Sequence, residues 1–270
     1  MKKIPFYKMQ GSGNDFILID NRRSVLKGTA LADIARTVCD RHYSVGADGL
    51  IVIAPSRKAD FKWRFLNADG SEAEMCGNGS RCAARFAYLK KIAGRQLSFE
   101  TLAGLIRAEV GKNSVKVQLT GAGALRMDLK VSLDGGTRTG HFINTGVPHL
   151  VYLSDDLQAE DVIATGRMTR YHALFKPAGT NVNFIQVQGR RKLAIRTYER
   201  GVEGETLACG TGSVAAALVA GTLGLVSSPV QVTTKSGEKL IVSFKRDGEG
   251  FTDLFLEGDA QVICEGNLYI

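Results

Sequence analysis

The feature that most restricts the fold of this 270-residue chain is a cysteine motif that occurs twice. The pattern C-G-x-G-S-x-x-A-A begins at Cys76 and again at Cys209, 133 positions later and close to half the chain length away. Each copy follows a strand pattern and a polar loop, has a glutamate four residues before the cysteine (Glu72, Glu205), and leads into a helical pattern. A duplicated domain explains these matches better than coincidence. We therefore expect two lobes with pseudo-two-fold symmetry.

Short strand patterns fill most of both halves of the chain. Segments such as DFILID, GLIVIA, NVNFIQV and KLIVSFK are rich in β-branched and aromatic residues. Glycine turns at 101–104 and 235–238 predict hairpins. We predict an α+β fold of two pseudo-symmetric lobes, each a curled, mostly antiparallel sheet around a central helix. The N-terminal lobe is expected to span 1–122 and the C-terminal lobe 123–258, with a C-terminal strand at 259–270 that returns to the N-terminal lobe.

Helical patterns are few. Two are expected at 29–42 and 155–165, the second with Asp155 as its cap. The other two follow the cysteine motifs and run to about Ile92 and about Leu223. The helix after Cys209 carries no charged residue, so we expect it to be buried on every side.

Composition argues against several classes of protein. The formal net charge is +8, but basic residues occur as scattered pairs between acids, so nucleic-acid binding is not expected. The N-terminus lacks the apolar region of a signal peptide, and no apolar run approaches the roughly 20 residues of a membrane helix. Five cysteines are an odd number, which argues against a secreted disulfide framework. We expect a cytoplasmic protein with reduced thiols that binds neither nucleic acid nor membranes.

A cysteine at a helix start lies beside free backbone N–H groups and the positive end of the helix dipole. We expect this position to lower the thiol pKa, so that a thiolate forms near neutral pH. The glycines of the motif give a carboxylate room to approach the same N–H groups. If two such motifs face each other, one sulfur can remove a proton from the carbon next to a bound carboxylate while the other delivers a proton to the opposite face. The pattern thus favours inversion of a stereocentre beside a carboxylate.

Other interpretations of the cysteines are weaker. A zinc site is disfavoured because Cys76 and Cys82 point to different faces of a helix. Gly210-x-Gly212 is a poor dinucleotide motif because the preceding strand ends about ten residues too early. A non-catalytic anion-binding or thiol-redox protein stays open as an alternative. Cys39, Cys82 and Cys264 are expected to be structural.

Along its whole length the chain resembles the diaminopimelate epimerase family. The matching stretches are GSGNDFILID, GADGLIVI, LNADGSEAEMCGNGSRC, GVPHLV, TNVNFIQV and YERGVEGETLACGTGS. The resemblance implies an isomerase that interconverts LL- and meso-diaminopimelate, in lysine and peptidoglycan-precursor biosynthesis. It also implies a homodimer that uses no cofactor and no metal.

The resemblance further implies roles for single residues. Cys76 and Cys209 match the catalytic pair. The family residues that hold the substrate carboxylate correspond here to Gly77, Asn78, Gly210 and Thr211. Other residues that contact the substrate correspond to Asn14, Asn67, Asn181, Glu199 and Arg200. The residues that tune the thiols correspond to His149 and Glu199. The chain departs from the family pattern at Val147, where asparagine is common, and at Gly49, where some members have glutamine. Cys264 aligns with a tyrosine that supports dimers in some members. An epimerase or racemase for another amino acid is therefore the alternative within the same fold.

Overall fold

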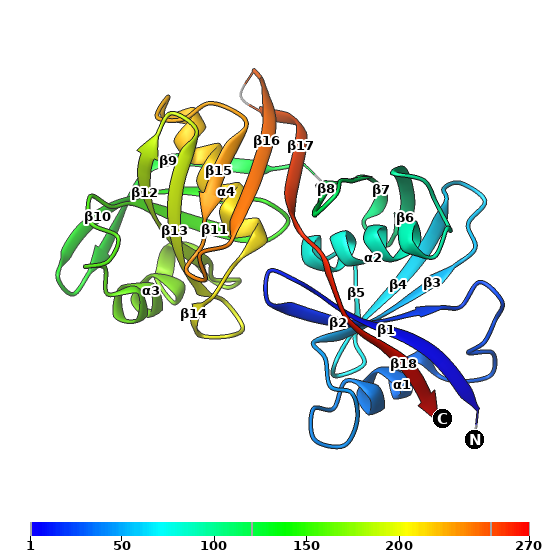
Figure 1. Cartoon of the computed structure of the whole chain (residues 1–270). Coiled ribbons are helices and arrows are strands. Elements are labelled where there is room, and N and C mark those ends of the chain that lie inside the picture. The colour runs from blue at the N-terminus through cyan, green and yellow to red at the C-terminus, as the bar shows by residue number, and fades with distance from the viewer. Residues whose placement is uncertain (1, 120, 249, 270) are drawn as a thin grey trace. The chain divides into compact units, whose positions relative to one another are not determined.

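Strands outnumber helices in the computed structural model, which describes residues 2–119, 121–248 and 250–269 (Figure 1). The chain divides into unit 1, formed by Met1–Gln118 and Glu257–Ile270, and unit 2, formed by Leu119–Leu256. Both units contain a sheet and a buried helix that begins at one of the two cysteine motifs.

Unit 1 contains helices α1 (Leu31–Val38) and α2 (Gly77–Leu89) and strands β1 (Lys3–Gly11), β2 (Asn14–Asp20), β3 (Gly49–Ala54), β4 (Phe61–Asn67), β5 (Glu72–Ala73), β6 (Gln96–Thr101), β7 (Gly104–Val110), β8 (Ser114–Gln118) and β18 (Gln261–Tyr269). Its strands pair in the order β18, β1, β2, β3, β4, β6, β7, β8. The pairs β2–β3 and β4–β6 are parallel, and the other pairs in this order are antiparallel. Helix α2 packs against strands from both ends of this order (β1, β2, β3, β7 and β8), so the sheet curls around it (Figure 1).

Unit 2 contains helices α3 (Val162–Arg170) and α4 (Gly210–Thr222), the short 3₁₀ helix η1 (Ala173–Phe175), and strands β9 (Gly123–Leu133), β10 (Gly136–Asn144), β11 (Pro148–Leu153), β12 (Asn181–Gly189), β13 (Lys192–Glu199), β14 (Gly204–Thr206), β15 (Val230–Thr233) and β16 (Lys239–Asp247). Strand β17 (Gly250–Asp259) crosses the boundary between the units. The pairing order is β9, β10, β11, β12, β13, β15, β16, with β11–β12 and β13–β15 parallel. Helix α4 packs against β10, β11, β12, β13, β15 and β16.

The sequence repeat is therefore a repeat of topology. Parallel pairs occupy the same places in both sheets, and a two- or three-residue strand, β5 or β14, pairs beside each cysteine loop. The place that β9 takes in unit 2 is taken in unit 1 by β18, from the far end of the chain. The predicted α+β class, with a curled sheet around a central helix in each half, is confirmed. Both predicted hairpins are also present, as β6–β7 and β15–β16.

The two central helices are buried for different reasons. In α4 every residue from 212 to 220 is buried and apolar or small, as the absence of charge predicts. Helix α2 instead buries two arginines. Arg81 donates from Nε to the Asp259 carbonyl at 3.0 Å, and Arg85 donates to the carbonyls of Gly111 and Ser114 at 2.9 and 3.1 Å. Their charges are tolerated inside unit 1 because backbone carbonyls solvate them.

The helix predicted at 155–165 is wrong at its start. Helix α3 begins at Val162, and its cap is Asp161, whose carboxylate accepts from the Ala164 N–H at 2.9 Å. Upstream, the Asp156 carboxylate accepts from the N–H groups of Gln158 and Ala159 at 3.0 and 3.3 Å. These bonds hold residues 156–159 in a turn instead of a helix. The spacing of apolar residues in the sequence does not predict such a turn. The helix predicted at 29–42 is shorter as well, since α1 covers only Leu31–Val38.

Among the described residues, no helix is long and apolar enough to span a membrane. All five cysteines are free thiols: Cys39, Cys82 and Cys209 are buried, Cys76 is partly buried and Cys264 is exposed.

Candidate active site

Both motif cysteines are helix N-caps. Cys76 and Cys209 have extended backbones, with φ of −142° and −131°, directly before α2 and α4. Each Sγ accepts a hydrogen bond from the N–H of the third helical residue, Gly79 or Gly212, at 3.4 Å. A sulfur thus takes the place that a serine, threonine or aspartate oxygen usually fills. Within its own unit, each sulfur has the same backbone environment.

The repeated glutamates anchor the strands that lead to the cysteines. Glu72 accepts two hydrogen bonds from Arg64, both at 2.7 Å, and Glu205 accepts two from Arg196, at 2.7 and 3.1 Å. Lys235 adds a third contact to Glu205 at 2.6 Å. These forked pairs join β4 to β5 and β13 to β14, so we interpret them as supports of the cysteine loops.

An amide cluster surrounds Cys76. The thiol lies 3.7 Å from Oδ1 of Asn14, and the same oxygen accepts from Asn78 Nδ2 at 3.5 Å. Asn14 Nδ2 donates to the Asp48 carboxylate at 2.5 Å, and Arg41 holds that carboxylate at 2.8 Å. The amide of Asn14 is therefore oriented with its oxygen toward the sulfur. The sequence predicted Asn14 and Asn78 here but missed Asp48.

Asn67 is occupied within its own turn. Its Nδ2 donates to Ser71 Oγ at 2.9 Å, and its backbone N–H donates to the Ser71 carbonyl at 2.8 Å. Asn67 pairs with Gly49 at the end of β4, where a Cβ at position 49 would lie 2.5 Å from the Phe65 ring. A side chain at position 49 is thus excluded by packing in this chain.

Cys209 is only 7% exposed, and the Thr211 hydroxyl lies 3.6 Å from its sulfur. Behind the motif is the buried side chain of Asn183, which the sequence analysis missed. Its amide bonds with Nδ1 of His149 at 3.2 Å and donates to the Leu150 carbonyl at 3.1 Å. If Asn183 donates to Nδ1, the ring proton of His149 lies on Nε2, which has no hydrogen-bond partner among the described residues.

Three strand ends bring the other predicted residues of unit 2 together. His149 pairs with Asn181 across β11 and β12. Glu199 ends β13 and Arg200 follows it. Asn181 Oδ1 accepts from the Arg200 N–H at 2.8 Å, and its Nδ2 donates to the Pro148 carbonyl at 3.1 Å. The Asn181 side chain therefore fixes the ends of the strands.

The predicted lowering of the thiol pKa is wrong. Burial raises the pKa of Cys76 above its ordinary value, although the N–H groups of Gly79 and Asn78 oppose the shift. Burial, with the nearby Glu199 carboxylate, raises the pKa of Cys209 to about 12. Burial also raises the pKa of Glu199. Loss of water around each sulfur outweighs the helix N-terminus, so both thiols are protonated near neutral pH in the absence of ligand.

His149 is expected to make unit 2 sensitive to acid. Burial, with the Arg200 charge, lowers the pKa of His149 from 6.5 to about 3, so protonation favours the unfolded chain. Its contribution to stability is complete above pH 6.5 and falls by up to about 1.4 kcal/mol per pH unit below it. Urea unfolding at several pH values will check this. His149→Gln should flatten the dependence, and His42→Gln, at an exposed position, should not. An unchanged slope in His149→Gln would contradict the assignment.

The third helical glycine is expected to tolerate alanine in α2 better than in α4. A Cβ at Gly212 would lie 2.4 Å from Asn183 Oδ1, whereas at Gly79 the nearest atom is the Ile51 Cδ1 methyl at 3.2 Å. We expect Gly212→Ala to lower the free energy of unfolding by about 1–3 kcal/mol, and Gly79→Ala by less, because a methyl group yields more easily than a bonded amide. Chemical denaturation of both variants measures the difference. Equal losses would show that the Asn183 contact is not tight.

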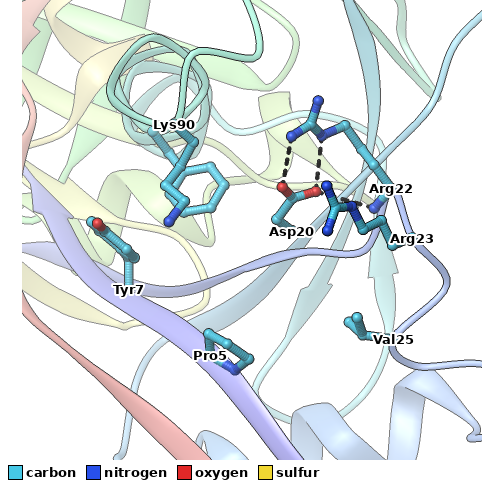
Figure 2. Close-up of a pocket in the computed structure, with 8 residues that line it drawn as sticks. Pro5, Tyr7, Asp20, Arg22, Arg23, Val25 and Lys90 are labelled. Carbon is cyan, nitrogen blue, oxygen red and sulfur yellow. Dashed lines mark hydrogen bonds and ion pairs between the residues drawn. The ribbon is translucent and has the colours of Figure 1, made fainter.

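A pocket in unit 1, of about 240 Å³, lies at the other end of α2 from Cys76 (Figure 2). Three of its charged groups, Asp20, Arg22 and Lys90, interact with neighbours. Arg22 donates twice to Asp20, at 2.8 and 3.0 Å, and Lys90 lies 5.1 Å from the centre of the Tyr7 ring. The cysteine motifs, where the unusual buried thiols lie, are therefore the better candidates for chemistry.

Comparison with known proteins gives a family match and a fold match. The family model described as diaminopimelate epimerase matches residues 6–125 and 141–263. A protein of that name from Aquifex aeolicus is 50% identical over 274 residues, which covers 97% of each chain. A Bacillus anthracis phenazine biosynthesis protein of the PhzF family has a TM-score of 0.76 at 16% identity, with 100% of each chain covered. A hydroxyproline epimerase from Agrobacterium vitis has a TM-score of 0.70 at 13% identity, covering 99% of this chain and 92% of its own. The two solved structures show the fold alone.

Proposed function

Because this chain belongs to the diaminopimelate epimerase family, we propose that it converts LL-2,6-diaminopimelate to meso-diaminopimelate by a two-base reaction that needs no cofactor. The observation that carries the proposal is the pair of cysteine N-caps at equivalent places in two units of the same topology. Inversion at a carbon removes a proton from one face and delivers a proton to the other, so it needs one acid–base group on each face. The duplicated motif provides this pair.

The proposed step moves one proton and no electrons between molecules. One sulfur, as thiolate, takes the α-proton, and the electrons of the broken C–H bond delocalise into the adjacent carboxylate. The other sulfur, as thiol, delivers its proton to the opposite face of the carbon. By family resemblance Cys209 accepts and Cys76 donates when the substrate is the LL isomer, and the roles reverse for the meso isomer. The helix N-termini stabilise the charge that develops on the carboxylate.

The remaining predicted residues would bind and orient the substrate. We assign the carboxylate cradle to Gly77, Asn78, Gly210 and Thr211, and further contacts to Asn14, Asn67, Asn181, Glu199 and Arg200. Support is strongest for Asn14, Asn78 and Thr211, whose side chains lie in the immediate surroundings of a sulfur. By family resemblance, His149 and Glu199 would tune the thiols.

Substrate binding would also supply the charge that ionises a thiol. Both sulfurs are protonated near neutral pH in the ligand-free protein, yet the reaction needs one thiolate. The α-ammonium group of the substrate brings a positive charge into the buried site, and a neighbouring cation favours the thiolate. The raised thiol pKa values are thus compatible with the proposal.

The deciding experiment is incubation of the reduced protein with LL-diaminopimelate in deuterated water. We expect meso product that carries deuterium at the inverted α-carbon, because the delivered proton comes from a thiol exchanged with solvent. The double variant Cys76→Ala/Cys209→Ala is the control and should give neither product nor label. If the unaltered protein forms no meso isomer and incorporates no deuterium, the proposed function is wrong.

A second candidate is an epimerase or racemase for another amino acid. Val147 and Gly49 favour it, because they replace an asparagine that is common in the family and a glutamine that some members have. A substrate panel separates the two: faster turnover of histidine, proline or glutamate than of diaminopimelate would support this candidate. A non-catalytic thiol-redox or anion-binding protein would instead show a reversible disulfide or tight phosphate binding, with no racemisation when reduced.

We also propose that the protein is a homodimer in the cytoplasm. The support is the family resemblance, together with exposed apolar side chains on β18, where Val262, Ile263 and Tyr269 are 41%, 55% and 62% exposed. Light scattering after size-exclusion chromatography will give the oligomeric state. A monomeric mass across the working concentration range would refute the dimer.

A further inference from the structure

The side-chain amide of Asn183, on β12, is bonded on all sides by the two neighbouring strands. Its Nδ2 donates to the Leu150 carbonyl of β11 at 3.1 Å and lies 3.2 Å from Nδ1 of His149, on the same strand. Its Oδ1 accepts from the Thr197 hydroxyl of β13 at 3.0 Å. Asn183 is fully buried, so these bonds take the place of bonds to water.

These contacts determine which atom of the amide faces His149. A backbone carbonyl only accepts hydrogen bonds, so the Leu150 carbonyl requires the amide nitrogen, and the amide oxygen then faces the Thr197 hydroxyl, which can donate. An amide nitrogen only donates, so Nδ1 of His149 must be the acceptor and carries no proton. In the neutral ring the proton is therefore on Nε2.

Nε2 of His149 is a donor without an acceptor. The ring is fully buried, and burial together with the Arg200 charge lowers the pKa of His149 to about 3, so the ring is neutral near pH 7. Nε2 has no hydrogen-bond partner among the residues that the structure describes. A buried N–H without an acceptor is uncommon and costs free energy. Such a donor suits an acceptor that forms or binds during function.

We propose that Asn183 is a positioning residue that holds His149 as a neutral ring with its proton on Nε2. His149 then serves the reaction as a hydrogen-bond donor and not as a base, because its unprotonated nitrogen is already bonded to Asn183. A negatively charged acceptor, such as a thiolate or a carboxylate oxygen, would gain most from this donor. The meaning of the proposal for catalysis rests on the proposed two-base function.

The test reads the protonation of each ring nitrogen without turnover. The reduced, ligand-free protein is labelled with ¹⁵N-histidine, and long-range proton–nitrogen correlation spectra near neutral pH distinguish protonated from unprotonated ring nitrogens. The chain has four histidines, and His149→Gln identifies the signals of His149. His141 is an internal reference, because its Nδ1 accepts from the Asp128 backbone N–H at 3.2 Å, a bond that does not involve Asn183. We expect His149 to be protonated at Nε2 alone.

Asn183→Asp replaces the donor that faces the ring with an acceptor. We expect Nδ1 of His149 to become protonated, because a carboxylate oxygen can only accept. The rate of LL-to-meso conversion should fall by about 10- to 100-fold, the scale of one hydrogen bond to a charged group. Thr197→Val is the matched control, since it removes another buried bond of the same amide while the Leu150 carbonyl still fixes the amide nitrogen. It should leave the His149 proton on Nε2 and lower the rate less.

A protonated Nδ1 of His149 in the unaltered protein would overturn the proposal, and this result needs no variant to fold. So would an unprotonated Nδ1 in a folded Asn183→Asp variant, or an unchanged rate when Nδ1 is protonated. Equal losses of rate in Asn183→Asp and Thr197→Val would show that Asn183 only supports the fold. Failure of the proposed function would appear separately, as missing deuterium exchange in unaltered protein whose His149 proton is on Nε2.

Discussion

Replacing either Cys76 or Cys209 with alanine is expected to lower the rate of LL-to-meso conversion by about 10²–10⁴-fold or more. This is the range for loss of one acid–base group. In the proposed reaction each sulfur serves one face of the α-carbon, so neither can substitute for the other. The variants should remain folded, because each loses one sulfur while Gly79 or Gly212 loses only a weak acceptor at 3.4 Å. Chiral chromatography of the product measures the rate, and thermal unfolding checks the fold.

The pattern of residual exchange gives a sharper test than the loss of rate. A variant with one thiol should still exchange the α-proton of one isomer with solvent deuterium slowly, and only on the face that its remaining sulfur addresses. Cys82→Ala is the control, because Cys82 is a buried thiol of α2 outside the proposed chemistry. Epimerisation at the unaltered rate in either Cys76→Ala or Cys209→Ala would exclude the two-base mechanism.

What the sequence could predict depended on local pattern and on the repeat. Absence of charge between residues 210 and 222 was enough to predict that α4 is buried, since an uncharged apolar helix has no face for water. The same reasoning could not find the buried arginines of α2. Arg85, for example, is solvated by the carbonyls of Gly111 and Ser114, which lie on a hairpin formed later in the chain.

The parts of the site that the sequence did not predict depend on long-range contacts. Asp48 orients Asn14 across 34 residues, and Asn183 meets His149 across 34 residues, through strand pairings that the order of residues does not reveal. The predicted direction of the thiol pKa shifts was wrong for a related reason. The helix start is visible in the sequence, but the loss of water around Cys76 and Cys209 follows from packing. The predicted lobe boundaries and the substrate contacts stay predictions.

Oxidation of the reduced protein with diamide is expected to abolish epimerisation completely, and a thiol reductant should restore it. The proposed two-base mechanism requires both sulfurs to reach one substrate carbon, so the expected product of oxidation is a Cys76–Cys209 disulfide, a bond that needs a Cα separation of about 4.4–6.8 Å. The two thiols lose two protons and two electrons to diamide, which is reduced to the hydrazine, and base and acid disappear together. Because the attacking species is a thiolate and both thiol pKa values are raised, inactivation should be slow near neutral pH and faster as the pH rises.

Peptide mapping of the oxidised protein identifies the bond that forms. Cys264→Ser is the control: it removes the exposed thiol, which can link two molecules, and it should inactivate at the same rate as the unaltered protein. A Cys76–Cys209 disulfide in protein that retains full activity would refute the two-base assignment, because neither sulfur could then carry a proton. Inactivation that disappears in Cys264→Ser would place the sensitive thiol on β18, and the motif cysteines would then not be the site of oxidation.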